Sequence, residues 1–139
     1  MSMSDYLENK LLNHVLNNTA YTPPTSVYVA LFTADPTDAF VTANEVSATV
    51  DDTAYARQAV THTTASGTSG TVTNTNAQTF AAVVYGSGAA PYTVTHYGYC
   101  DAPTGGNLLF AAPITGTGIV RSTGVALTFD IGQLSAVLT

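Results

Sequence analysis

The spacing of apolar residues changes near residue 20, and the patterns on either side of that point predict different structures. Before it, five apolar residues follow one face of a helix, namely Leu7, Leu11, Leu12, Val15 and Leu16. We therefore expect a helix over residues 4–17, because Ser4 is a suitable N-cap and Pro23-Pro24 prevents its continuation. This apolar face either covers one end of the chain's own core or docks onto a partner.

After the prolines the pattern becomes that of β-strands. Residues 26–33 include a β-branched and aromatic run that is typical of a central, buried strand. Shorter candidate strands, each bounded by glycine, proline, asparagine or serine, follow at 55–63, 70–74, 78–84, 92–100, 107–113, 119–121 and 124–129. Short strands without intervening helices predict a mainly β, antiparallel β-sandwich. We expect a single domain over residues 1–139, with the helix at 4–18 and the sandwich at 26–139.

The chain is poor in charged side chains, which restricts what it binds. Only 9% of its residues are charged, against roughly a quarter in ordinary soluble domains, and its formal net charge is -6. Its three basic residues, Lys10, Arg57 and Arg121, are scattered, whereas phosphate binding needs a basic cluster, so we expect no nucleic-acid partner. No apolar run approaches the roughly 20 residues that cross a bilayer, so we expect no membrane partner either.

Residues capable of catalysis or metal binding are present, but not with the spacing of a known site. Gly86-Ser87-Gly88 lacks the spacing of a nucleophile elbow. Asp35 and Asp38 are typical turn formers, and no loop has the ligand pattern of a dedicated calcium site. The histidines His14, His62 and His96 lie far apart along the chain. Cys100 follows His96 by four residues, which in a strand places the two about 13 Å apart, so a zinc site is not expected. We therefore expect no catalytic, cofactor or metal site.

Tyrosine is the residue that most suggests an interface, because the chain has eight tyrosines and no tryptophan. Tyr97 and Tyr99 are expected on one face of a strand, where successive side chains alternate. Tyrosines in such positions suit a β core, a protein interface or a glycan-stacking surface, and these alternatives stay open. The candidate interface residues are Leu7, Leu11, Val15, Tyr97 and Tyr99.

Several segments together resemble a family of small tailed-bacteriophage virion proteins. In the first half they are SDYLENKLL at 4–12, VYVALFT at 27–33 followed by DPT at 35–37, and YARQAV at 55–60. The likeness continues with HYGY at 96–99, DAPTGGNLLF at 101–110 and LTF at 127–129, and so extends over almost the whole chain. Members are labelled tail fibre or structural proteins, and some resemble cement proteins that have a jelly-roll β-sandwich.

The resemblance implies a virion structural protein that is not an enzyme. Because the chain is short, unrepeated and carries its own helix, we expect a jelly-roll-like cement or decoration protein on the capsid exterior, made in the host bacterial cytoplasm. It would clamp neighbouring capsid subunits non-covalently. The expected partners are the phage major capsid protein and further copies of the chain itself, as a dimer or trimer. The alternative is a tail-associated or tail fibre module that binds a host surface receptor or glycan.

Overall fold

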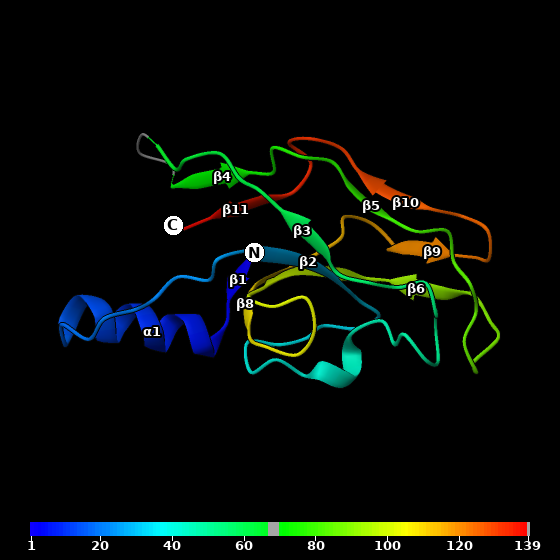
Figure 1. Ribbon diagram of the computed structural model, residues 1–139, viewed down its shortest axis with the longest axis horizontal. Coiled ribbons are helices and arrows are strands. Elements are labelled where there is room, and N and C mark those ends of the chain that lie inside the picture. The colour runs from blue at the N-terminus through cyan, green and yellow to red at the C-terminus, as the bar shows by residue number, and fades with distance from the viewer. Residues whose placement is uncertain (67–69, 139) are drawn as a thin grey trace.

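The computed structural model describes residues 1–66 and 70–138, so residues 67–69 and 139 of the predicted sandwich lie outside the described residues. Figure 1 shows a mainly β structure, with one α-helix at the N-terminal end of the chain. One layer is a five-stranded antiparallel sheet with the strand order β1-β8-β7-β2-β3. Its strands are β1 (Ser2–Met3), β2 (Val27–Phe32), β3 (Gln58–Val60), β7 (His96–Cys100) and β8 (Leu108–Pro113).

The second layer is built from short antiparallel ladders. They pair β4 (Thr71–Thr73) with β11 (Ser135–Val137), β5 (Gln78–Phe80) with β10 (Leu127–Phe129), and β6 (Tyr92–Val94) with β9 (Ile119–Arg121). In Figure 1 the ladders β4–β11 and β5–β10 lie over one side of the large sheet, and β6–β9 lies at the end remote from the helix. This arrangement confirms the predicted antiparallel β-sandwich with a short N-terminal helix.

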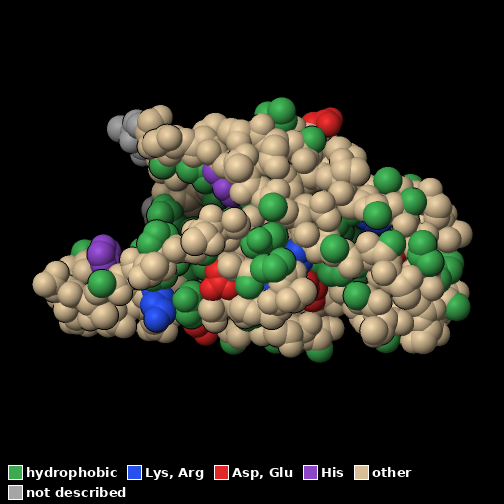
Figure 2. Space-filling model, viewed as in Figure 1, with side chains coloured by type: hydrophobic (Ala, Val, Ile, Leu, Met, Phe, Trp, Pro, Cys, Tyr) green, Lys and Arg blue, Asp and Glu red, His purple; other side chains and the backbone are tan. Residues whose placement is uncertain are grey.

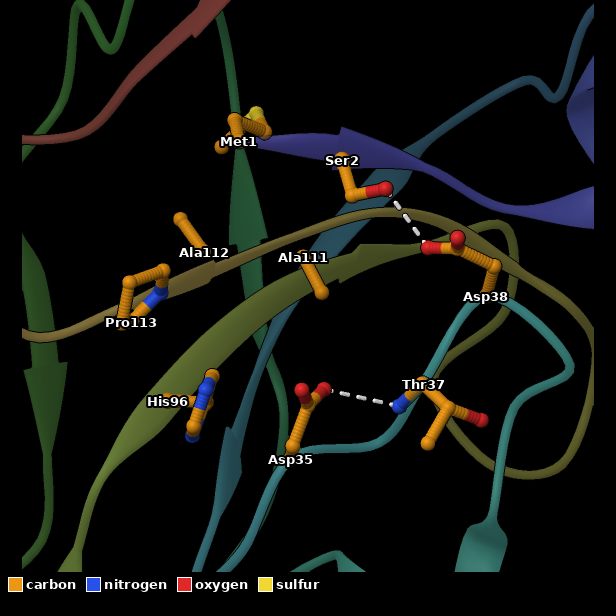
Figure 3. Close-up of a pocket in the computed structure, with 9 residues that line it drawn as sticks. All are labelled: Met1, Ser2, Asp35, Thr37, Asp38, His96, Ala111, Ala112 and Pro113. Carbon is orange, nitrogen blue, oxygen red and sulfur yellow. Dashed lines mark hydrogen bonds between the residues drawn. The ribbon is translucent and has the colours of Figure 1, made fainter.

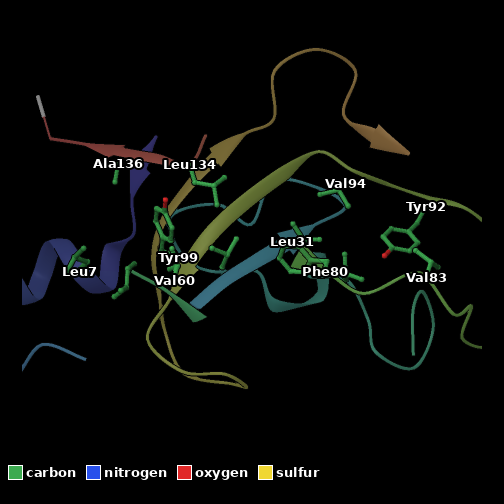
Figure 4. Close-up of a cluster of buried hydrophobic side chains, with 13 residues drawn as sticks. Leu7, Leu31, Val60, Phe80, Val83, Tyr92, Val94, Tyr99, Leu134 and Ala136 are labelled. Atoms are coloured by element: carbon green, nitrogen blue, oxygen red, sulfur yellow. The ribbon is translucent and has the colours of Figure 1, made fainter. Parts of the chain in front are cut away.

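Strand β2 contributes to two hydrophobic cores because its side chains alternate between the two sides of the sheet. Val29 and Leu31 belong to the larger core, which lies between the layers and is drawn in Figure 4. Ala30 and Phe32 belong to a smaller core on the opposite side, against which Phe40 packs. Both sides of β2 are therefore covered, which explains its continuous apolar sequence and confirms the predicted central strand.

The helix α1 (Asp5–Leu16) agrees closely with the predicted range. Ser4 is the N-cap, and its side chain accepts a hydrogen bond from the backbone N–H of Leu7. Asn17 is the C-cap, and its backbone N–H bonds to the carbonyl of Asn13. Among the helix residues only Leu7 is buried, so most of α1 lies outside the core.

Several predicted strands are shorter or divided in the structure, including the candidate at 78–84, which is reduced to β5, and the candidate at 124–129, which is reduced to β10. Two observed strands were not predicted. The candidate at 92–100 is divided at Thr95, whose N–H bonds to the carbonyl of Phe32 and whose carbonyl accepts the N–H of Ile114. The candidate at 55–63 is reduced to β3, whose three residues pair with residues 27–29 of β2. The two strands that were not predicted, β1 and β11, have two and three residues.

Candidate functional site

The most accessible apolar surface on a regular element belongs to α1. Figure 2 shows the helix as an arm that extends from one end of the molecule. Leu12, Val15 and Leu16 are 56%, 74% and 73% exposed, although a surface helix normally turns its apolar face to the core. Leu16 follows Leu7 by nine positions, which places it about half a turn round the helix from the buried side chain. The apolar stripe therefore continues past the body of the protein onto its free side.

The first turn of α1 fixes the direction of the arm. The N–H of Ser4 donates to the carbonyl of Leu109 over 3.0 Å, and its hydroxyl donates to the carbonyl of Leu108. The N–H of Asp5 donates to the carbonyl of Asp38 over 3.0 Å. Ahead of these bonds, β1 pairs with β8 at the edge of the large sheet. The arm is thus joined firmly to the body at its base, whereas its far end projects.

The structure distributes the predicted interface residues over different environments. Leu7 is buried, Leu11 is half-buried and Val15 is exposed. On β7, Tyr97 is half-buried and Tyr99 is buried, with their rings edge to face at 6.1 Å between centroids. Burial raises the pKa of both tyrosines. Of the five predicted residues only Val15 is freely accessible.

The exposed residues Leu12 and Leu16 were part of the apolar pattern that predicted the helix, but they were not among the candidate interface residues. Sequence periodicity places residues on a helix face but does not say which part of a wide apolar face meets the body. The position of the body is fixed by the pairing of β1 with β8 and by the cap at Ser4. The one feature of the sequence that could have indicated Leu12 and Leu16 is the width of the apolar face on this short helix.

A buried ion pair connects two of the segments that resemble the phage family, YARQAV at 55–60 and DAPTGGNLLF at 101–110. Arg57 makes a two-bond contact with Glu45, from Nε to Oε1 at 2.7 Å and from Nη2 to Oε2 at 2.6 Å. Its Nη1 donates to the carbonyls of Ala102 and Gly105, both at 2.8 Å, and Tyr55 donates to the same Glu45 carboxylate at 2.9 Å. Burial acts to lower the pKa of Arg57, but the bonds and charge of Glu45 outweigh it and the pKa is raised. This cluster joins YARQAV at 55–60 to the loop at 101–107.

Asp52 forms a second buried polar cluster and is fully engaged in structural bonds. Its carboxylate accepts the hydroxyl of Tyr92 and the backbone N–H groups of Ala54 and Val84, each at 3.0 Å. Arg121 lies 3.6 Å from the same carboxylate. Burial is the largest cause that raises the pKa of Tyr92, and the Asp52 hydrogen bond adds to it. The contacts of Asp52 therefore hold together three separate segments of the second layer.

A cavity of about 480 Å³ gathers two aspartates and a histidine beside β1, as Figure 3 shows. Asp35 accepts the N–H of Thr37 at 2.9 Å, as expected for a turn former, and Asp38 accepts the hydroxyl of Ser2 at 2.6 Å. His96 shares a hydrogen bond with Thr95 at 2.9 Å. Over residues 1–66 and 70–138, no three histidine, cysteine, aspartate or glutamate side chains are grouped so that they could hold a metal ion.

The fold and the projecting arm define the class of protein as a small antiparallel β-sandwich with an N-terminal helix. Among the described residues, no helix is long and apolar enough to cross a membrane. Over residues 2–137 the chain matches the family model described as "Podophage GP4 fiber I protein gp80". It therefore belongs to this family of phage virion structural proteins. No curated protein matches the chain.

The family match confirms the predicted phage virion structural protein. Its description names a fibre protein, which agrees in part with the alternative role that the sequence left open. The description does not name a cement or decoration protein, so the narrower cement prediction gains no support from it.

Proposed function

We propose that the chain is a fibre-type structural subunit of the virion, attached through the apolar face of α1 to a neighbouring virion protein. In this proposal the β-sandwich is the rigid body and the helix is the attachment arm. The observation that carries it is the exposure of Leu12, Val15 and Leu16 on a helix whose base is firmly bonded to the body. Apolar helix faces of this kind bind in grooves of partner proteins through residues at i, i+3 and i+4.

The attachment would be driven by burial of the arm's apolar side chains. Removing such side chains from water contributes about 25 cal/mol for each Å² of apolar surface. Charge would contribute little, because the formally charged side chains of the arm are Lys10 and the acidic Asp5 and Glu8, which do not form a cluster of one sign. The partner surface should therefore be an apolar groove on another virion protein or on a neighbouring copy of the chain.

Incorporation into virions tests the role of the arm. A copy with a C-terminal epitope tag would be supplied from a plasmid during infection, and its amount in purified virions would be measured. We expect Leu12→Ser/Val15→Ser/Leu16→Ser to leave the melting temperature unchanged and to reduce incorporation at least tenfold. The matched control is Val120→Ser/Val125→Ser/Ile131→Ser, which changes three exposed apolar residues of the body and should be incorporated normally.

Equal incorporation of both variants would rule out attachment through α1. Immunogold labelling of virions then determines where the subunit is located. Label on the tail or on fibres supports the fibre role and makes recognition of a host receptor or glycan the next question.

A capsid cement role is the second candidate, and the small size of the body with its projecting arm favours it. In that role the arm would bind across a seam between neighbouring major capsid subunits. Because the chain would bind only the assembled shell, its binding would stabilise the shell against disassembly. Label spread over the head in many copies would support this role and exclude the fibre assignment.

A further inference from the structure

An open groove lies along β10, where that strand faces the end of β8. Its volume is about 530 Å³, which is within the range of small-molecule sites. The lining consists of three runs of consecutive residues, at 113–115, 127–129 and 133–135, together with Tyr97 and Ile119. Successive side chains of a strand point to opposite faces, so a groove that contacts all three residues of β10 follows the edge of this strand.

The lining divides into an apolar floor and a polar rim. The aliphatic and aromatic residues that form the floor are half-buried or buried, namely Tyr97, Ile114, Ile119, Leu127, Phe129 and Leu134. The polar residues of the rim are all exposed and comprise Thr115, Thr128, Gln133 and Ser135. Among the described residues, none with a charged side chain lines the groove, although the formal net charge of the chain is -6.

Three polar groups of the rim are available to a ligand. Within residues 1–66 and 70–138, the hydroxyls of Thr115 and Ser135 and the Nε2 amide of Gln133 make no hydrogen bond. The other amide atom of Gln133, Oε1, accepts the backbone N–H of Asp130 at 2.7 Å. This bond fixes the Gln133 side chain and leaves its two N–H donors free.

The walls of the groove are held in place by bonds to both layers. The hydroxyl of Tyr97, on the large sheet, donates to the carbonyl of Ser135 at 3.4 Å. The fully buried Asn74 accepts the N–H of Leu134 through Oδ1 and donates through Nδ2 to the carbonyl of Asp130, both at 2.9 Å. A site that is formed before its ligand arrives has little ordering entropy to lose on binding.

The composition of the lining identifies the class of ligand. A surface without charged side chains favours an uncharged ligand, because a charged group would lose water there without gaining an ionic partner. A pyranose ring has apolar C–H faces and a border of hydroxyls, so it would cover the floor and bond to the rim at the same time. The rings of Tyr97 and Phe129, 6.2 Å apart between centroids, add aromatic surface for a C–H face. We propose that this groove binds a neutral saccharide.

The groove stays open when the arm is attached. Ser4, at the base of α1, bonds to the carbonyls of Leu108 and Leu109 at the beginning of β8, whereas the groove begins at Pro113 at its other end. Four strand residues separate Leu109 from Pro113, which corresponds to about 13 Å. In Figure 1, β9 and β10 both lie toward the end of the molecule remote from α1. Saccharide binding therefore does not depend on the proposed attachment through α1.

Binding of the isolated, full-length chain to intact host cells tests the class of ligand. One sample of cells is treated with periodate, which cleaves the vicinal diols of sugars, and another with protease. We expect binding to be lost after periodate and kept after protease. It should also be equal in low and high salt, because no charge of the groove takes part. Binding that survives periodate, binding that falls steeply with salt, or no binding to untreated cells would overturn the proposal.

Variants of the rim show whether the groove is the binding site. Thr115→Val/Ser135→Ala removes two exposed hydroxyls, so it should leave the melting temperature unchanged and weaken binding to untreated cells about tenfold or more, the effect of two typical hydrogen bonds. The matched control is Ser87→Ala/Thr104→Val, which removes exposed hydroxyls outside the groove and should bind normally. Thr115→Trp places a large ring in the groove and should abolish binding. Full binding by either groove variant would contradict the proposal.

Virions distinguish a saccharide site from a contact with another virion protein. A phage whose genome encodes Thr115→Val/Ser135→Ala should incorporate the chain normally but adsorb to host cells several-fold more slowly. Reduced incorporation would mean that the groove contacts a virion protein, and unchanged adsorption would mean that it recognises nothing on the host; either result would overturn the proposal. Failure of attachment through α1 would appear separately, as normal incorporation of the arm variant.

Discussion

Arg57 and Glu45 meet through two parallel hydrogen bonds, with Arg57 3% exposed and Glu45 15% exposed at their side chains. The guanidinium also binds two carbonyls of the 101–107 loop, so nearly all of its donors are used. The pair connects three segments that are far apart in the sequence and gives both residues a structural role.

Breaking this pair should be strongly destabilising. We expect Arg57→Met or Glu45→Gln to lower the free energy of unfolding by about 3 kcal/mol or more, because each leaves a buried group without its charged partner. Arg57→Lys should also destabilise, since an ammonium group has too few donors in the right geometry. Urea unfolding measures these differences, and Lys10→Met on the exposed side of α1 provides a control with the same loss of charge.

Gly98 should not tolerate a side chain. A Cβ at this position would lie 2.8 Å from Leu108 Cδ1 and 2.8 Å from the carbonyl oxygen of Phe110. We therefore expect Gly98→Ala to lower the free energy of unfolding by about 1–3 kcal/mol through overpacking. Thermal unfolding monitored by circular dichroism would check this, and an unchanged melting temperature would contradict the close approach of β7 and β8.

The thiol of Cys100 should be inert in the folded protein. Burial raises its pKa to about 12, and the side chain has no exposed surface. Because the thiolate is the reactive form, we expect no labelling by iodoacetamide at pH 8 until the protein is unfolded in urea. Rapid labelling under native conditions would indicate that the smaller core opens.

Stability should fall in mildly acidic solution because of His62. Burial lowers its pKa below 6.5 in the folded state, so as the pH falls the unfolded chain takes up a proton before the folded chain does. The contribution of the neutral His62 ring to the free energy of unfolding is therefore complete above pH 6.5, and it is lost as the pH falls toward the folded-state pKa of His62. Urea unfolding at pH 7.5 and pH 5.5 should show a smaller loss for His62→Gln than for the wild type.

Two leucines of α1 should differ strongly in their response to the same substitution. Leu7 is buried, so Leu7→Ala should lower the free energy of unfolding by about 2–4 kcal/mol. Leu12 is exposed, so Leu12→Ala should change it by less than about 0.5 kcal/mol. Chemical denaturation measures both, and a large effect at Leu12 would mean that the arm folds against the body in solution.

The elements that could be predicted from sequence are those with local causes. The helix was recognisable from its period and its cap at Ser4, and β2 from a continuous apolar run. The strands β1 and β11 depend on pairing with distant partners, β8 and β4, which no local pattern reports. Sequence therefore predicts the fold class, whereas strand number and register need the three-dimensional structure.

The proposed docking surface was recognisable from the sequence only in part. The apolar helix face was visible in the sequence, but the depth at which α1 enters the body separates Leu7 from Val15, and that depth is set by hydrogen bonds of Ser4 with β8. The small pocket lined by His62, Tyr99 and residues of four further strands had no sequence signal, because its lining comes from segments that are far apart in the chain. Long-range juxtaposition of this kind is not encoded in any short segment.

The two ends of α1 lead to strands that are held in the sheet by different numbers of hydrogen bonds, and this difference affects how the protein responds to a pulling force. The N-terminal end leads into β1, a two-residue edge strand, and the C-terminal end leads through residues 17–26 to β2, which is held on both sides. If a docked arm were pulled away from the body, β1 would shear from β8 first. The remaining tension would pass into β2, so the module would stretch at its base before its centre gave way.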